Sequence, residues 1–438
     1  MYHLALLLYN LLFPALFLLY LPFYLRKLRR RGNYRRGFWE RFGIYGRRRQ
    51  ELQAYVGCTW VHAVSVGEAV AALGLIRRWQ EAQPGRRFVL STTTSTGQQL
   101  ARDKAPDGVA VIYFPIDVWP CVRSALRLLQ PAQLVLFEVE VWPNIIRLAG
   151  RRGIPVSLVN CRMSDRSAAG YRRHRWFFRH VFDSFAAILV QTQEDARRVA
   201  AIVDRADAAE VCGTMKFDQT PDREGGDIGP LLDRVFPADR LCFCAASTHA
   251  PEEEVIARLT AEVRAEVPQL RLILVPRHQE RQAEAEAALT AAGLDYCLLT
   301  DLRASAEGYE RAALIVNTTG ELMDFLAASD LVFVGKSLGD FGGDGGHNII
   351  EPAIFGKPIL HGPAMENFRD VAAVFQAAEA AIQVADEADL RARLLALATQ
   401  PDLRARYARA SRETVERHRG AIARTIDRLE DLPAAARG

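Results

Sequence analysis

The chain has 438 residues, half of them apolar and a quarter charged, and its formal net charge is +4. This length is enough for two or three domains with large cores, and the composition is ordinary for a globular protein. Seven cysteines without a CxxC pair argue against a zinc site or a disulfide framework and indicate a reducing compartment.

The N-terminal segment is the most apolar part of the chain. Leu4 to Leu25 is a run of 22 residues without a charge, long enough to span a bilayer, and RKLRRR follows it at once. By the positive-inside rule, the arginine-rich side and everything after it would stay cytoplasmic. A helix lying in the membrane interface is the second interpretation, because Asn10, Pro14 and Pro22 weaken a clean span. A cleaved signal peptide is the third, although its charges normally precede the apolar core.

A basic block follows the apolar run. Residues 26–49 hold eleven Lys or Arg and one Glu, a net charge of +10, so the rest of the chain sums to −6. This asymmetry indicates a local anionic partner and argues against general nucleic-acid binding. We therefore expect residues 1–49 to be a membrane anchor with a basic juxtamembrane segment, in contact with lipid through residues 4–25 and 26–49.

From residue 50 onward, strand-like and helix-like segments alternate, which is typical of βαβ units around a parallel sheet. A linker rich in Gly, Pro and charge, Asp218 to Pro230, interrupts the alternation, which then restarts. The sequence predicts an α/β fold of two Rossmann-like, doubly wound domains, residues 50–225 and 231–438, facing a central cleft. The last helix is free to pack back on the first domain. Ligands bind such folds at the carboxyl ends of the strands.

The first strand–loop–helix unit carries a glutamate. The stretch HAVSVGEAVAA, residues 62–72, places Ser65 and Glu68 at capping-box spacing, in which each side chain bonds the other residue's backbone N–H. Glu68 is equally a carboxylate at the carboxyl end of a strand, facing a ligand crevice. These residues alone leave both interpretations open.

In the second half, Arg277 and His278 follow the strand-like LRLILV. Arginine offers a fork of donors to phosphate, or closes a helix start at the surface. Further on, glycines between 342 and 346 precede Asn348 and Glu351 at a helix start. A phosphate at the helix start and a ribose on the carboxylate fit this pattern, and so does a simple capped turn.

Motifs for other chemistries are missing from the sequence. No HExxH, paired-cysteine, DxD or nucleophile-elbow motif is present, so no metal site is predicted. Gly335-Lys336-Ser337 lacks the upstream glycine of an ATPase phosphate loop. The acidic run Glu252 to Glu254 is explained as compensation of a helix dipole. Organic cations and dipoles would then have to stabilise a leaving phosphate.

Eleven short stretches share order and content with one known family. They are WERFG (39–43), SVGE (65–68), EVEVWPN (138–144), NCRMSDRSAAGY (160–171), QTQED (191–195), GTMKFD (213–218), STHAPEEE (247–254), LILVPRHQER (272–281), TTGELM (318–323), GGHNIIEPA (345–353) and ENF (366–368). Each stretch is a weak signal, but the ordered series is specific. The chain resembles the Kdo (3-deoxy-D-manno-octulosonic acid) transferases of lipopolysaccharide synthesis.

The resemblance implies a GT-B glycosyltransferase anchored on the cytoplasmic face of the inner membrane. It implies inverting, metal-independent transfer of Kdo from CMP-Kdo to lipid IVA, with no cofactor and no nucleic-acid partner. The family's catalytic base falls on Glu68. Its CMP-binding residues fall on three stretches, which are Pro276, Arg277 and His278; Gly320, Glu321 and Leu322; and Asn348, Ile349, Ile350 and Glu351. Glu138 and Glu140 are expected in acceptor or structural roles.

The sequence departs from the family at two places beside the expected donor pocket. Lys336 stands where the family usually has glycine, and the loop 339–346 is longer and more acidic. Two alternative functions therefore stay open. One is a paralogous glycosyltransferase with another sugar nucleotide or lipid acceptor. The other is a non-catalytic, membrane-anchored nucleotide-sugar binder, although binding alone would need no base at Glu68.

Overall fold

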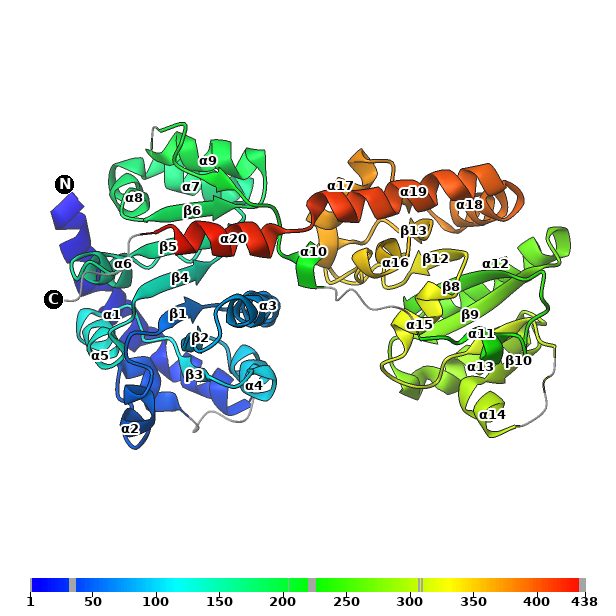
Figure 1. Ribbon diagram of the computed structural model, residues 1–438, viewed down its shortest axis with the longest axis horizontal. Helices are drawn as coiled ribbons and strands as arrows, with labels where there is room; N and C mark the ends of the chain where they lie inside the picture. The colour runs from blue at the N-terminus through cyan, green and yellow to red at the C-terminus, as the bar shows by residue number, and fades with distance from the viewer. Residues whose placement is uncertain are drawn as a thin grey trace. The chain divides into compact units, whose positions relative to one another are not determined.

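The computed structural model describes residues 2–30, 37–203, 205–219, 226–305, 308 and 310–432. The chain forms two compact units (Figure 1). Unit 1 comprises Met1–Gln219 together with Arg419–Gly438, and unit 2 comprises Thr220–His418. Part of the predicted linker, residues 220–225, lies outside the described residues. The second unit thus ends at His418, twenty residues before the predicted boundary at Gly438.

Unit 1 is built on a seven-stranded parallel sheet in the order β3-β2-β1-β4-β5-β6-β7. Its strands are β1 (Thr59–His62), β2 (Phe88–Thr92), β3 (Val109–Tyr113), β4 (Gln133–Phe137), β5 (Val156–Cys161), β6 (Ala187–Val190) and β7 (Glu210–Val211). Alternate residues of one strand enter two different cores: Trp60 packs in one cluster and Val61 in the other. Helices therefore cover both faces of the sheet, as in doubly wound folds.

The helices of unit 1 connect these strands. They are α1 (Tyr2–Arg30), η1 (Phe38–Phe42), α2 (Arg48–Gln53), α3 (Val66–Ala82), α4 (Ser95–Lys104), α5 (Trp119–Leu129), α6 (Pro143–Gly150), α7 (Asp165–Arg173), α8 (Arg175–Phe182), α9 (Gln193–Val203), α10 (Lys216–Gln219) and α20 (Ala421–Glu430). The alternation of strand and helix along the chain confirms the predicted α/β class.

The N-terminal helix α1 docks on unit 1. Tyr9 Oη donates to Asp117 Oδ2 at 2.9 Å, and Asn10 Nδ2 donates to Asn144 Oδ1 at 3.1 Å. Within the described residues, no helix combines the length and the apolar content needed to cross a membrane. The membrane-spanning anchor predicted at Leu4 to Leu25 is therefore not supported. The physical reason is that two polar side chains of the segment, Tyr9 and Asn10, bond to unit 1.

Part of the basic block is also internal. The Arg41 side chain is buried, its Nη1 donates to the Thr93 carbonyl at 2.7 Å, and its guanidinium lies 3.7 Å from the Tyr113 ring centroid. Arg48 pairs with Glu40 at 2.7 Å and with Glu51 at 2.8 Å. These two cations stabilise unit 1 rather than a lipid surface. Residues 31–36 of the block lie outside the described residues.

Unit 2 has its own seven-stranded parallel sheet, in the order β10-β11-β9-β8-β12-β13-β14. Its strands are β8 (Leu241–Thr248), β9 (Leu270–Pro276), β10 (Tyr296–Leu298), β11 (Ala313–Ile315), β12 (Leu331–Val334), β13 (Ile359–His361) and β14 (Ile382–Gln383). The order of the sheet reverses between β8 and β12, as it does between β1 and β4 in unit 1. Each sheet therefore has a switch point where ligands commonly bind.

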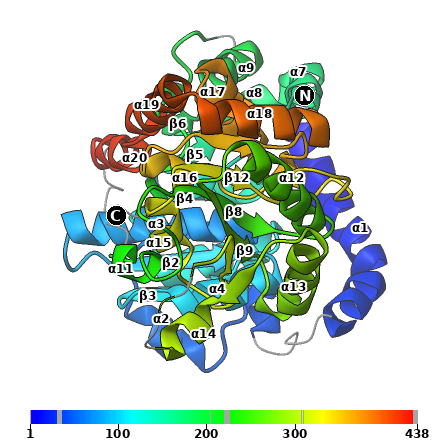
Figure 2. The same cartoon turned by 90° about the vertical axis from the view of Figure 1, so that its right-hand side faces the viewer.

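Unit 2 ends in two consecutive helices, α18 and α19. Its helices are α11 (Gly229–Leu232), α12 (Glu252–Glu266), η2 (Gln279–Arg281), α13 (Gln282–Ala291), α14 (Leu299–Ala304), α15 (Leu322–Ala327), α16 (Ile350–Ile354), η3 (Glu366–Phe368), α17 (Arg369–Ala377), α18 (Glu387–Thr399) and α19 (Pro401–His418). Helix α12 packs beside α13 and α18 (Figure 2).

The last helix, α20, completes unit 1, where it is drawn in red in Figure 1. The Glu430 carboxylate accepts hydrogen bonds from Trp79 Nε1 and Gln83 Nε2, both at 2.7 Å. It also pairs with Arg86 at 2.7 Å. At the other end of the helix, Asp218 accepts from the backbone N–H of Gly420 and Ile422. Polar contacts at both ends thus fix α20 to unit 1.

Candidate functional site

Glu68 lies in the first turn of α3, directly after β1. Its Oε2 accepts from Val64 N at 2.8 Å and its Oε1 from Ser65 N at 3.2 Å, while Ser65 Oγ accepts from Glu68 N at 3.2 Å. The predicted capping box is confirmed. Glu68 remains 8% exposed, and each carboxylate oxygen can accept more than one bond. Capping therefore fixes the orientation of the carboxylate and leaves it capacity for a further proton.

Two more carboxylates follow the neighbouring strand β4. Glu138 has a left-handed backbone, with φ of 54°, and Glu140 accepts from Trp142 Nε1 at 2.8 Å. Burial and, after it, the charges of Glu68 and Glu138 raise the pKa of Glu140 to about 7, against the opposing hydrogen bond from Trp142. The carboxyl edge of this sheet thus concentrates negative charge, and Glu140 exchanges its proton near neutral pH.

Three aromatic side chains contact one another near this edge of the sheet. The His62 ring lies 3.7 Å from Phe114, centroid to centroid, and Phe114 lies 6.0 Å from Trp142. His62 is fully buried, and burial lowers its pKa to about 3, so the imidazole is neutral. The sequence pattern did not single out these rings, because Phe114 and Trp142 lie far from His62 along the chain. Phe114, which stacks on His62, also contacts Trp142 at a tilted angle, and Trp142 donates to Glu140.

In unit 2, Glu252 ties two loops together at the carboxyl edge of the sheet. The carboxylate is fully buried. It accepts four backbone hydrogen bonds, from His249 N at 3.0 Å, Lys336 N at 2.7 Å, Ser337 N at 2.8 Å and Leu338 N at 3.0 Å. Dipole compensation therefore does not account for this residue. It joins the loop after β8 to the loop after β12.

Three histidines gather at this edge. His249 Nε2 and His347 Nε2 are 3.0 Å apart, and the ring of His278 lies 5.7 Å from that of His249. Burial and, after it, the neighbouring His249, Arg277 and Lys336 lower the pKa of His347 to about 4. Both rings of the close pair are therefore neutral, and one donates to the other. His278 is thus brought beside the segment that leads to Asn348.

The other predicted donor residues lie around two short helices. Asn348 Nδ2 donates to Glu351 Oε1 at 3.2 Å, and burial raises the pKa of Glu351. Ile349 and Ile350 are fully buried, so they contribute packing rather than polar side-chain contacts. Helix α16, which holds Glu351, packs against α15, which begins at Leu322.

Gly320 and Glu321 precede α15. Gly320 has a φ of 87°, which favours glycine, and Glu321 is engaged by Arg303 and by Thr318 Oγ1. Arg277 and His278 are exposed just after Pro276, the last residue of β9. All three predicted donor stretches therefore lie in unit 2, and Glu68 belongs to unit 1. Among the residues the structure describes, no group of three or more His, Cys, Asp or Glu could hold a metal ion.

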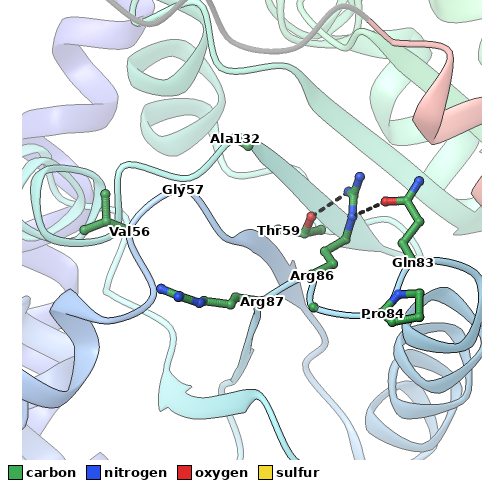
Figure 3. Close-up of a pocket in the computed structure, with 9 residues that line it drawn as sticks. Val56, Gly57, Thr59, Gln83, Pro84, Arg86, Arg87 and Ala132 are labelled. Atoms are coloured by element: carbon green, nitrogen blue, oxygen red, sulfur yellow. Dashed lines mark hydrogen bonds between the residues drawn. The ribbon is translucent and has the colours of Figure 1, made fainter.

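A cavity of about 430 Å³ opens at the other end of the unit 1 strands (Figure 3). Thr59, the first residue of β1, lines it, whereas Glu68 follows the last. Arg86 donates to Gln83 Oε1 at 2.8 Å and to Thr59 Oγ1 at 3.1 Å, and it pairs with Glu430. Its charge is thus neutralised within unit 1. We do not assign the functional site to this cavity, because it lies at the amino ends of the strands.

Comparison with known proteins places these sites in a family context. Residues 36–219 match the family model described as 3-Deoxy-D-manno-octulosonic-acid transferase (kdotransferase). A 3-deoxy-D-manno-octulosonic acid transferase of Bordetella pertussis is 34% identical over 427 residues, which cover 93% of this chain and 94% of that protein. The transferase of the same description from Haemophilus influenzae is 29% identical over 399 residues, 91% of this chain and 92% of that protein.

One solved structure of another protein shares the fold. A putative UDP-N-acetylglucosamine 2-epimerase from Listeria monocytogenes aligns with a TM-score of 0.52 at 12% identity, covering 86% of this chain and 98% of that one. The C-terminal CMP-Kdo binding domain of WaaA from Acinetobacter baumannii is 27% identical, covers 43% of this chain and 95% of that one, and gives a TM-score of 0.39. The likeness to the epimerase structure supports an α/β fold with parallel sheets, in agreement with the predicted α/β class.

Proposed function

Because the chain belongs to the 3-deoxy-D-manno-octulosonic-acid (Kdo) transferase family, we propose that it transfers Kdo from CMP-Kdo to lipid IVA. Family membership supports a glycosyltransferase acting in lipopolysaccharide synthesis. The donor, the acceptor and the residue roles below are our proposal. The observation that carries it is Glu68, a carboxylate held by two backbone N–H groups at the carboxyl end of β1.

In this proposal Glu68 is the general base. It takes the proton of an acceptor sugar hydroxyl while that oxygen attacks the anomeric carbon of the donor. The bond from that carbon to the CMP phosphate breaks, its electron pair leaves with the phosphate, and the configuration inverts. A positioned base contributes about 10²- to 10⁴-fold in rate. The bonds from Val64 and Ser65 keep the carboxylate in one orientation, which favours catalysis because no reorganisation is needed.

We assign the donor to unit 2. The Arg277 guanidinium would bind the phosphate that departs, because arginine presents several donors in one plane. Glu351, oriented by Asn348, would accept from the ribose hydroxyls. Pro276 and His278 would flank the phosphate, and the stretch 320–322 would contact the nucleotide from α15. Stabilising a departing phosphate is the main requirement of this step, because the charge develops there.

We further propose that α1 attaches the protein in the plane of the cytoplasmic face of the inner membrane. One set of its side chains is strongly exposed and apolar: Leu4, Leu7, Leu8, Leu11, Leu12, Leu16, Leu19 and Phe23. Other residues of α1, including Tyr9 and Asn10, hold it to unit 1. A helix with one docked side and one apolar exposed side suits the membrane interface. Basic residues of the 26–49 segment at the surface would add about 1 kcal/mol each near anionic lipid.

The test is the mass of the product after mixing the protein with CMP-Kdo and lipid IVA. Glu68→Gln should keep CMP binding and lose about 10²- to 10⁴-fold in turnover. Glu81→Gln is the matched control, since Glu81 lies on the same helix and its side chain is 63% exposed. It should keep wild-type turnover.

Other outcomes point elsewhere. Full activity in Glu68→Gln would contradict the role as base and leave Glu68 as a capping residue. A wild-type protein that adds Kdo to no lipid acceptor, but uses another CMP-linked sugar, would identify the paralogue with altered donor. CMP binding without any turnover would support the non-catalytic binder.

A further inference from the structure

Lys336 occupies an unusual backbone position at the edge of unit 2. It follows β12 by two residues and has a φ of 55°, in the left-handed region that favours glycine. Its N–H is held by Glu252, and its carbonyl accepts from Gly346 N at 2.6 Å. A lysine in this conformation costs more than a glycine would. These two backbone hydrogen bonds fix the main chain of Lys336, independently of the contacts that its side chain makes.

The ammonium group of Lys336 has an anionic partner that solvent can replace. Lys336 Nζ lies 2.7 Å from Asp344 Oδ2, with the lysine side chain 18% exposed and the aspartate side chain 72% exposed. Asp344 Oδ1 also accepts from Asn367 Nδ2 at 3.1 Å. The cation is thus largely covered, while the carboxylate stands in water on the loop 339–346. An ion pair of this kind contributes little to stability and exchanges readily.

Of the two carboxylates that contact Lys336, Glu252 is committed to backbone N–H groups, and Asp344 alone reaches the ammonium group among the described residues. Burial and, after it, the charge of Lys336 lower the pKa of His249, and burial is the largest cause of the lowered pKa of His347. Arg281 is already paired with Glu253. Among the described residues, the Arg277 guanidinium has no hydrogen bond or ion pair of its own. A cluster with two available cations and one exchangeable carboxylate has the chemistry of an anion site.

We propose that Lys336 binds an anionic group of the donor, and that Asp344 holds its charge only while the donor is absent. The anionic group is the nucleotide phosphate or the carboxylate of the sugar acid. This inference rests on the proposed function, and it adds Lys336 to the donor-binding residues. The exchange needs no new backbone conformation, because the main chain of Lys336 is already fixed by Glu252 and Gly346.

The experiment measures ligand binding by calorimetry on the full chain, with cytidine, CMP and CMP-Kdo as probes. Lys336→Met should weaken the anionic ligands about tenfold or more and leave cytidine unchanged. Equal losses for CMP and CMP-Kdo identify the phosphate, and a loss for CMP-Kdo alone identifies the carboxylate. Lys336→Gly should show the same loss, and it guards against a folding defect because glycine accepts this φ freely.

Asp344→Asn is the matched control. It removes the competing carboxylate, so it should leave CMP-Kdo binding unchanged or tighter. If Lys336→Met and Asp344→Asn weaken binding alike, the pair only stabilises the loop and the proposal is wrong. Wild-type affinity in both lysine variants would also overturn it. A wild-type protein that binds no CMP would instead overturn the proposed function, and this assignment with it.

Discussion

Glu68 in unit 1 and Glu252 in unit 2 occupy the same place in their sheets. Each lies in the first turn of the helix that follows the first strand of its sheet, and each accepts the backbone N–H of the residue three positions earlier. Their further partners differ. Glu68 adds only Val64 N, from its own loop, whereas Glu252 adds three N–H groups from the loop after β12.

This difference shows how one position in a fold serves two purposes. Four backbone donors use up the acceptor capacity of Glu252, and the carboxylate is fully buried. Two donors leave Glu68 with remaining lone pairs and a small exposed surface. The first carboxylate holds loops together, and the second is positioned by its loop but stays available to a substrate.

The largest expected effect comes from removing each carboxylate. Glu252→Ala leaves four backbone N–H groups without an acceptor, so the free energy of unfolding should fall by about 4 kcal/mol. Glu68→Ala loses a capping box, worth about 1 kcal/mol. Denaturant unfolding of both variants measures the contrast. Equal losses of stability would contradict the distinction between the two sites.

A smaller effect concerns pH and the edge of unit 1. The pKa of Glu140 is about 7 in the folded chain against an ordinary value of 4.5. Between these two pH values the unfolded state releases the proton first, so the free energy of unfolding falls as pH rises. We expect a fall of about 2 kcal/mol, less than the full shift implies because the side chain is only partly buried.

Glu140→Gln should remove this fall, and unfolding measured from pH 4 to pH 8 would show a flatter curve. Glu81→Gln, on an exposed pair, should keep the wild-type slope. If the slope persists in Glu140→Gln, another group is responsible, and the assignment of the titrating group to Glu140 is wrong.

The smallest expected effect is the loss of stability on changing Glu430, a carboxylate with a purely structural role. Glu430→Gln removes the charge that pairs with Arg86, whose side chain is 24% exposed, so unit 1 should lose about 1 kcal/mol of stability. Glu210→Gln is the control, because its pair with Arg428 is more exposed and should contribute less than about 0.5 kcal/mol. Thermal unfolding compares the two. A loss in Glu210→Gln as large as in Glu430→Gln would contradict this ranking.

Local patterns in the sequence predicted the structural features that depend on residues close together in the chain. The alternation of strands and helices and the Ser65–Glu68 capping box were both confirmed, because hydrophobic periodicity and capping act over a few positions. The role of Glu252 was not predicted, since three of its donors lie 84 to 86 residues away. Only the pairing of β8 with β12 brings them together.

The N-terminal helix is a second case in which contacts between residues distant in the sequence were not predicted. Uncharged residues predicted a span, but Tyr9 and Asn10 find partners more than a hundred residues later, at Asp117 and Asn144. Composition treats such residues as tolerable interruptions of an apolar run, and it does not reveal polar partners that are distant in the sequence. The predicted donor residues and Glu68 lie where the pattern of strands placed them, at the carboxyl edges, and their roles stay predictions.

The return of α20 to unit 1 also sets an order of events during synthesis. Trp79 emerges 351 residues before its partner Glu430. At ordinary elongation rates, Trp79 therefore waits roughly 20 to 70 s for the last helix, an interval in which all of unit 2 is translated. The surface that α20 covers is apolar, with Ile422, Ile426 and Leu429 packed into the core. During that interval the nascent unit 1 exposes a patch that chaperones recognise, and a ribosome that stops early releases a chain that cannot bury it.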